Sequence, residues 1–223
     1  FSNEEVSILY EETEEYKQKV ASMKTSNKVK TEFIPKRVLT YTFENLSRNR
    51  EKGMLATEII KICRSILNGQ SSRGVYVYGP TGTGKTYLMG SIYNYFKQNG
   101  KEPTILYYPE FIRKIKSKIS DNSYDLYIDL VRDEEILIID DIGAENITEF
   151  IRDEVLGPII NHREAEKLPT FFSSNLSIDD LAELLSNGRT TVDRTKALRI
   201  VERIHSLCSS HFLDGENERE YYN

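Results

Sequence analysis

The sequence predicts an α/β protein with a doubly wound parallel sheet, in which helices cover both faces of the strands. Short runs rich in β-branched and aromatic residues alternate along the chain with stretches of helical periodicity. Within the strand expected over 135–139, residues 136–139 form an unbroken apolar run, which is typical of a strand buried on both faces. A glycine-rich turn joins the run at 74–79 to a helical stretch at 87–96, which indicates a strand–loop–helix unit.

Local patterns predict the other elements. Pro35 and several strand-forming residues indicate an extended segment over 33–46, and Gly157 with Pro158 predicts a kink in the helix expected over 149–167. The expected strands are 74–79, 103–108, 135–139, 169–173 and 210–213, and the other expected helices are 51–67, 111–119, 177–185 and 190–207. Residues 1–32 are predicted to form a charged arm, helical over 3–20, and a linker, and residues 33–223 the core domain.

Composition excludes several classes of protein. Charged residues make up 29% of the 223 residues, and no apolar run approaches the ~20 residues of a membrane span. The acidic start lacks the features of a signal peptide, so we expect a cytoplasmic protein. Cys63 and Cys208 are expected to be core thiols, and the three histidines lack metal-ligand spacing. Because the net charge is −5, any contact with nucleic acid must come from a local basic patch.

The glycine-rich turn has the spacing G-x-x-x-x-G-K-[ST], which predicts a nucleotide-binding loop. Glycines let backbone N–H groups surround phosphate oxygens, and the next helix directs its positive end at the same anion. The lysine would reach the outer phosphates, and the threonine hydroxyl would bind Mg²⁺. A chance turn is the alternative, and the strand and helix around the motif argue against it. The predicted loop residues are Gly79, Pro80, Thr81, Gly82, Thr83, Gly84, Lys85 and Thr86.

Two carboxylates follow the apolar strand at 135–139, at the kind of strand end that gathers around ligands in open α/β sheets. Asp140 is expected to bind Mg²⁺, directly or through water, and Asp141 to orient or deprotonate the attacking water. Two acids alone would be weak evidence. Together with the glycine-rich loop, they predict a nucleotide hydrolase rather than a passive binder.

Asn175 follows the strand at 169–173 and would lie beside the ends of the first and third strands. It could hold the water or the terminal phosphate, although the residues alone favour a turn residue and helix cap. An exposed arginine on the helix at 190–207 could reach a phosphate only in a neighbouring subunit. Surface ion pairing, for instance with Glu202, is the alternative for its basic residues, Arg194, Lys196, Arg199 and Arg203.

The most basic short segment contains Arg113, Lys114, Lys116 and Lys118, on a helix whose apolar residues share another face. It could be a solvated helix surface or a patch that binds a nucleic-acid backbone, and the residues favour neither. Tyr124 and Tyr127, expected in the following loop, could stack on bases or pack in the core, with packing slightly favoured.

Four features in this order resemble an AAA+ ATPase: the loop at 79–86, the acidic strand end at 136–141, the strand end at 173–175 and the arginine-bearing stretch at 197–204. Within that superfamily the chain closely resembles the bacterial replicative-helicase loaders of the DnaI/DnaC type. The runs at 78–86, 140–145 and 168–176 carry this resemblance, and residues 212–217 add to it. It covers about residues 35–220, nearly the whole predicted core.

The resemblance implies a three-layer P-loop AAA+ fold with a five-stranded parallel sheet and little or no C-terminal lid domain. It implies that Lys85 and Thr86 bind ATP and magnesium. It also implies that Asp140 and Asp141 form the Walker B pair, and that Asn175 is the sensor 1 residue rather than a turn residue.

The resemblance also implies how the protein acts. Arg203 best matches the arginine finger that reaches a neighbouring subunit's phosphates, with Arg199 as competitor, so the ATP state would self-associate. The basic segment falls where loaders carry an inserted helix facing single-stranded DNA, which favours the patch. The implied function is to place the hexameric replicative helicase on DNA during replication initiation, with release on ATP hydrolysis.

Two departures from the family pattern affect these expectations. The N-terminal cysteine/histidine zinc module of such loaders is absent from this sequence. Many relatives have Asp-Glu where this chain has Asp140 and Asp141. The shorter second acid would lie farther from the water, so we expect slow hydrolysis.

Three alternatives stay open. A transposase-helper ATPase of the IstB type shares every motif but remodels duplex DNA, and only the DnaI-like runs argue against it. A P-loop small-molecule kinase would need no arginine from a neighbour, and Asp140, Asp141 and Asn175 count against it. A non-hydrolysing adaptor would bind ATP without turnover.

Overall fold

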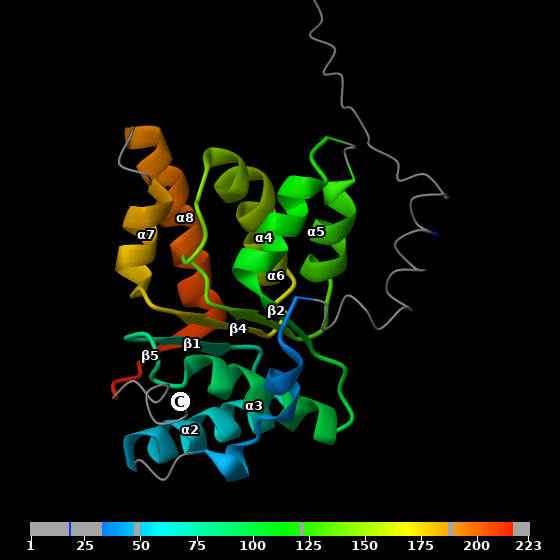
Figure 1. The fold of residues 1–223 in the computed structure, drawn as a ribbon, viewed down its shortest axis with the longest axis vertical. Coiled ribbons are helices and arrows are strands. Elements are labelled where there is room, and N and C mark those ends of the chain that lie inside the picture. Colours follow the sequence, from blue (N-terminus) through cyan, green and yellow to red (C-terminus); the bar gives the residue numbers. More distant parts are fainter. Residues whose placement is uncertain (1–17, 19–32, 47–49, 121–122, 187–189, 216–223) are drawn as a thin grey trace, which may run out of the picture.

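A five-stranded sheet separates two layers of helices in this protein (Figure 1). The computed structural model describes residue 18 and residues 33–46, 50–120, 123–186 and 190–215. The arm helix expected over 3–20 therefore lies almost wholly outside the described residues. The three-layer α/β architecture confirms the predicted fold class, and in the described residues nothing after the last strand builds a lid domain.

All five strands pair in parallel, in the order β2-β3-β4-β1-β5. They are β1 (Gly74–Tyr78), β2 (Thr104–Tyr107), β3 (Leu137–Asp140), β4 (Thr170–Ser174) and β5 (Cys208–Phe212). Each boundary lies within two residues of the prediction. Because β4 lies between β1 and β3, the carboxyl ends of these three strands adjoin, as a ligand site in such a sheet requires.

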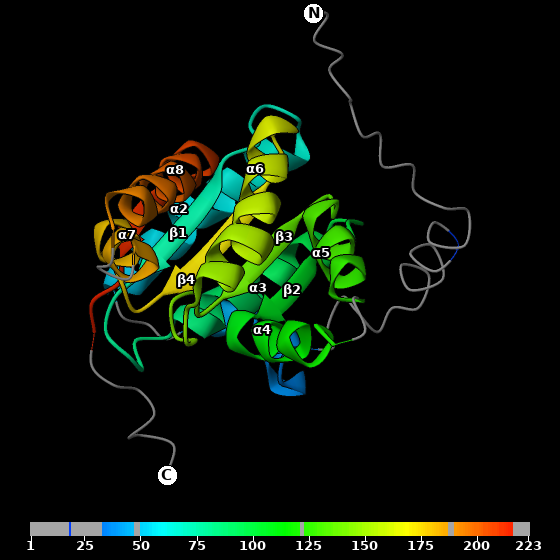
Figure 2. The same cartoon turned by 90° about the horizontal axis from the view of Figure 1, so that it is seen from above.

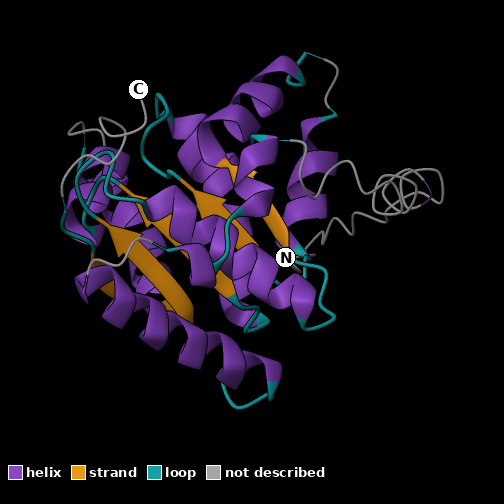
Figure 3. Ribbon diagram, turned by 60° about the horizontal axis from the view of Figure 1, so that its bottom comes forward, coloured by secondary structure: helices purple, strands orange, loops and turns teal. Residues whose placement is uncertain are grey.

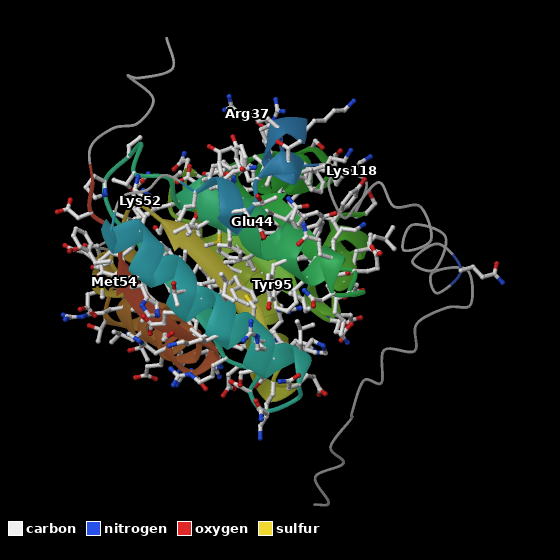
Figure 4. The ribbon with its side chains drawn as sticks, turned by 90° about the horizontal axis from the view of Figure 1, so that it is seen from below. Arg37, Glu44, Lys52, Met54, Tyr95 and Lys118 are labelled. Carbon is white, nitrogen blue, oxygen red and sulfur yellow. The ribbon has the colours of Figure 1, made fainter. Side chains whose placement is uncertain are left out.

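Helices cover both faces of the sheet, as Figures 2 and 3 show. On one face lie α2 (Arg50–Leu67) and α3 (Lys85–Gln98); on the other lie α4 (Tyr108–Ser117), α5 (Tyr124–Arg132), α6 (Gly157–Ala165), α7 (Ile178–Ser186) and α8 (Thr191–Leu207). Each face has its own apolar core, with Val77 in one and Tyr76 in the other. Figure 4 looks onto the first face, with Tyr95 of α3 near its centre and Met54 of α2 at its edge.

The segment over 33–46 is not the extended chain that was predicted. It forms two 3₁₀ turns, η1 (Lys36–Thr40) and η2 (Phe43–Asn45), and is extended between them. The amide of Asn94 on α3 donates to the carbonyls of Leu39 and Tyr41, at 2.9 and 2.7 Å. Gly90 permits this close approach, since a Cβ there would lie 2.5 Å from the Val38 carbonyl oxygen. The segment wraps α3 because side chains of that helix hydrogen-bond its carbonyls. Its first residue also meets the sheet, where the N–H of Tyr107 at the end of β2 donates to the Phe33 carbonyl at 3.2 Å.

Tyr124 and Tyr127 lie on α5 and not in the predicted loop. Tyr127 is buried among the core residues of its face, and the ring of Tyr124 meets that of Phe150 edge-on, with centroids 5.4 Å apart. Of the two roles left open for these rings, the structure supports packing.

The helix expected over 149–167 changes its hydrogen-bonding pattern at the predicted kink. Residues Ile151–Leu156 form a π-helical segment, and α6 follows from Gly157. The N–H of Gly157 donates to the carbonyl of Arg152, five residues earlier. Pro158 lacks an N–H group, and the wider turn before it absorbs the irregularity.

The described residues also bear on the expected state of the cysteines, on metal-binding clusters and on membrane-spanning helices. Cys63 and Cys208 are both buried free thiols, as predicted. Among the described residues, no three histidine, cysteine or acidic side chains lie close enough together to hold a metal ion. Within the same ranges, no helix combines the length and the apolar composition needed to cross a membrane.

Candidate nucleotide site

The loop between β1 and α3 has the left-handed glycine conformations that the motif predicts. Gly79, Gly82 and Gly84 have φ angles of 151°, 89° and 96°, which other residues rarely adopt. A Cβ on Gly79 would lie 2.1 Å from the carbonyl oxygen of Leu213, in the chain that follows β5. Glycine is therefore required there by both the backbone angle and the neighbouring strand end.

Lys85, the first residue of α3, lies inside this loop. Its ammonium donates to the carbonyls of Gly79 and Pro80 at 2.7 and 2.6 Å, and only 7% of the residue is exposed. The first turn of α3 carries no acidic residue, so the positive end of the helix is not neutralised by its own sequence. A buried ammonium, a helix N-terminus and a glycine-rich loop together form an anion site.

Asp140, at the end of β3, connects the loop to the middle of the sheet. The Thr86 hydroxyl donates to its Oδ2 at 3.0 Å and the Ser173 hydroxyl to its Oδ1 at 2.5 Å. Burial raises the pKa of Asp140 to about 6, while these two hydrogen bonds favour the ionised form. The structure thus brings together Thr86 and Asp140, which the sequence separates by 54 positions.

The second acid lies beside the expected amide. The Asn175 side chain donates to Asp141 Oδ1 at 3.3 Å. Asp141 has a φ of 64°, which is costly for a residue other than glycine, and the Ser173 hydroxyl accepts a hydrogen bond from its backbone N–H at 2.9 Å. The predicted proximity of Asn175 to this strand end is therefore correct.

Three residues of this site escaped the sequence analysis. Ser173 bonds both the Asp140 side chain and the Asp141 backbone. Burial and the adjacent Asp141 carboxylate raise the pKa of Tyr107 at the end of β2, and Glu145 accepts from the backbone of the loop after β3. Polar residues at the ends of buried strands were the available signal. For Ser173 and Tyr107 the signal is incomplete because their partners lie at the end of another strand, whereas Glu145 bonds Gly143 within its own loop.

The two candidate arginine fingers lie one turn apart on α8. Arg203 donates to the carbonyl of Arg199 at 3.0 Å, and neither guanidinium hydrogen-bonds the loop at 79–86 within the described residues. The structure therefore does not bring them into the site of the same chain.

The basic segment lies on α4 and at its C-terminal end. Arg113 pairs with Glu110 and its side chain is 79% exposed. Lys114 lies 5.5 Å from the centre of the Tyr127 ring, and Lys116 donates to the Asn146 carbonyl at 3.3 Å. Lys118 caps the helix and is partly exposed. All four cations are on one short helical unit, and each has local contacts that a phosphate would have to share or replace.

Comparison with known proteins identifies the family. Residues 38–194 match the family described as the bacterial DnaA ATPase domain. The replicative helicase loader DnaI of Bacillus subtilis (strain 168) is 33% identical over 198 residues, which are 88% of this chain and 64% of that protein. A crystal structure of DnaI, 31% identical, superposes with a TM-score of 0.73 over 82% of this chain and 95% of that one.

A more distant structure shares the fold alone. It is the replication initiator DnaA bound to AMPPCP and single-stranded DNA, 18% identical, with a TM-score of 0.56 over 79% of this chain and 50% of that one. The family match covers well over half of the chain and includes the phosphate loop and both acids. The chain therefore belongs to the bacterial DnaA ATPase-domain family of AAA+ proteins and is similar to the DnaI helicase loaders.

Proposed function

We propose that this protein is an ATP-dependent loader of the replicative helicase, which binds ATP with Mg²⁺ and hydrolyses it slowly. The observation that carries the proposal is the hydrogen-bonded series from Thr86 through Asp140 to Ser173, with Asn175 and Asp141 beside it. This series joins the phosphate loop to the ends of β3 and β4. A nucleotide at the loop would therefore share one site with both acids.

Binding of ATP would use groups that are already gathered. Lys85 would exchange the carbonyls of Gly79 and Pro80 for the outer phosphates. The Thr86 hydroxyl and the Asp140 carboxylate supply the oxygen ligands that Mg²⁺ prefers, so these two residues would hold the ion. Bound there, Mg²⁺ supplies positive charge that offsets the charge of the phosphates.

Hydrolysis would depend on Asp141, the acid that orients the water or accepts its proton. Asn175 holds the Asp141 carboxylate by its amide, which supports a sensor role at the same position. An aspartate is one methylene shorter than the glutamate of many relatives. We therefore propose slow turnover that acts as a switch and that DNA regulates.

The helicase partner is inferred from the similarity to DnaI, which is a replicative helicase loader. This chain spans 64% of that relative, so the partner is a proposal here. The cations of α4 and its C-terminal cap are proposed to bind the backbone of single-stranded DNA; they are Arg113, Lys114, Lys116 and Lys118. Self-association in the ATP state would bring Arg203, or Arg199 one turn earlier, to the phosphates of a neighbouring subunit.

A reconstitution experiment tests the proposal. The full chain is mixed with the hexameric replicative helicase, ATP and a single-stranded oligonucleotide, and complexes are measured by size-exclusion chromatography. We expect a ternary complex that needs ATP and is lost in Lys85→Ala, because the loop then lacks its ammonium. The matched control is Lys101→Ala, which removes a lysine that pairs with Glu135 at the surface.

Other outcomes would contradict the proposal. An equally stable complex without ATP, or with Lys85→Ala, would show that nucleotide does not control assembly. Selective binding to a transposase would favour the transposase-helper alternative. Transfer of phosphate to a metabolite would favour the kinase alternative.

A further inference from the structure

Glu145 is a half-buried acid in the loop after β3 that the proposed reaction does not use. Its Oε2 accepts a hydrogen bond from the backbone N–H of Gly143 at 3.0 Å. Its Oε1 is buried and has no hydrogen-bond partner among the described residues. Burial raises the pKa of Glu145 to about 7, with a further contribution from the charge of Asp141. A buried carboxylate oxygen without a hydrogen-bond partner lowers the stability of the folded state, and such a group is often kept for a structural or functional role.

The loop that Glu145 contacts carries an unfavourable backbone angle at the second acid of the site. Asp141 lies in the left-handed region with a φ of 64°, and Gly143 follows in the same region with a φ of 89°. On one side, β4 holds the loop, because Ser173 bonds the N–H groups of Asp141 and Ile142, each at 2.9 Å. On the side away from β4, the Glu145 carboxylate accepts from the N–H of Gly143, and within the turn the N–H of Ala144 donates to the Asp141 carbonyl at 3.4 Å. The angle at Asp141 is therefore held between two anchors.

Helix α4 lies next to Glu145 and the residue that follows it. Tyr108, the first residue of α4, is fully buried, and its hydroxyl has no hydrogen-bond partner among the described residues. The charge of Glu145 adds to burial in raising the pKa of Tyr108, so the two groups lie close together. Near the other end of α4, Lys116 donates to the carbonyl of Asn146, the residue after Glu145. Glu145 is thus confined between the Gly143 turn and the helix.

We propose that Glu145 is a positioning residue for Asp141. Its carboxylate holds the Gly143 turn, which keeps the left-handed backbone at Asp141 and so directs the Asp141 side chain. Glu145 acts through the backbone and does not itself meet the nucleotide. The inference rests on the proposed ATP hydrolysis, because Asp141 has its role there.

The test compares two substitutions in the full chain. Glu145→Ala removes the acceptor for Gly143, whereas Glu145→Gln retains one in its amide oxygen. We expect Glu145→Ala to lower kcat about tenfold or more while the Kd for ATP stays within about threefold, and Glu145→Gln to restore most of kcat. The matched control, Glu166→Ala, removes an exposed acid after α6 and should leave both constants unchanged.

A second measurement does not depend on turnover. Hydrogen exchange of the peptide that spans 141–147 should be faster in Glu145→Ala and close to wild type in Glu145→Gln. Unchanged exchange in Glu145→Ala, wild-type kcat in that variant, or equal loss in both variants would overturn the inference. A wild-type chain that hydrolyses no ATP would instead overturn the proposed function, and the exchange comparison would still decide whether Glu145 holds the loop.

Discussion

At the scale of single residues, the site consists of carboxylates that are buried to different degrees. Asp140 is 2% exposed and receives hydrogen bonds from two hydroxyl groups. Glu145 accepts from the backbone, including the N–H of Gly143 at Oε2, while its Oε1 has no hydrogen-bond partner among the described residues, and burial dominates its pKa. Since the balance between burial and hydrogen bonding determines which acid keeps a proton, neighbouring acids in one loop can ionise at different pH values.

This balance predicts how stability depends on pH. The pKa of Glu145 is about 7 in the folded chain, above the ordinary value of 4.5, so the folded state keeps a proton that the unfolded state releases between these values. The free energy of unfolding of the wild type should therefore fall, relative to Glu145→Gln, as pH rises from about 4.5 through about 7, by up to about 3 kcal/mol. Lys116 limits the fall, because its charge favours the ionised acid.

Urea unfolding of both proteins between pH 4 and about 8 measures the difference. Asp140 titrates in both proteins, so its contribution cancels. Parallel curves for the two proteins would contradict the prediction.

At the scale of elements, buried arginines connect the helices to the sheet. Arg163 on α6 is completely buried and donates to the Thr170 hydroxyl at 2.8 Å and to the carbonyls of Arg132, Glu134 and Pro169 at 2.9, 2.7 and 2.8 Å. Burial lowers its pKa to about 9. These bonds hold α6 against the end of α5 and the segments that enter β3 and β4. The same strands carry the acids and Asn175 at their other ends.

Arg163→Met should therefore destabilise the whole domain. The methionine side chain fills similar space but cannot donate to the Thr170 hydroxyl or to the carbonyls of Arg132 and Glu134, so we expect a loss of about 3 kcal/mol or more in the free energy of unfolding. Chemical denaturation measures this loss. Arg132→Met is the matched control, because that side chain is one-third exposed and pairs with Asp129, and it should cost about 1 kcal/mol or less. Equal losses in the two variants would contradict this account of Arg163.

At the scale of the whole molecule, the arginines of α8 and the phosphate loop lie on separate elements of one chain. α8 is held to the core by Arg152, which is 1% exposed and donates to Asp193 at 2.8 Å. Arg199 and Arg203 have no hydrogen bond to the loop at 79–86 within the described ranges. A role in hydrolysis therefore requires a second copy, whose loop would meet this helix.

Mixing two inactive variants tests this arrangement. Lys85→Ala keeps both arginines but has a defective loop, whereas Arg203→Ala keeps an intact loop but lacks one arginine. Each variant alone should therefore lose turnover at least about tenfold. An equimolar mixture should recover about a quarter of wild-type turnover, because random neighbours then pair an intact loop with an intact arginine. Arg199→Ala is tested in the same way, and recovery only with that variant would assign the finger to Arg199. The absence of recovery with both would contradict a finger supplied by a neighbour.

Much of the fold was determined by local sequence. The continuous apolar runs and the helical periodicities predicted all five strands to within two residues, because burial on both sheet faces leaves a strong pattern. The motif at 79–86 also determined the loop conformation, since Gly79, Gly82 and Gly84 adopt angles that few other residues tolerate. By itself, the sequence thus determined the α/β class, the phosphate loop and the two acids at the end of β3.

Only the tertiary structure decided which distant residues meet. It placed the segment at 33–46 in 3₁₀ turns, because the Asn94 side chain of α3 hydrogen-bonds carbonyls of this segment and Gly90 of α3 lets its backbone approach closely. It joined Thr86 to Asp140 through a strand order in which β4 separates β1 from β3, an order that no local pattern encodes. It also buried one carboxylate oxygen of Glu145 near Tyr108 of α4, since hydrogen bonds and burial depend on side chains far apart in sequence. Local periodicity reports how each segment packs, whereas the site depends on which segments become neighbours.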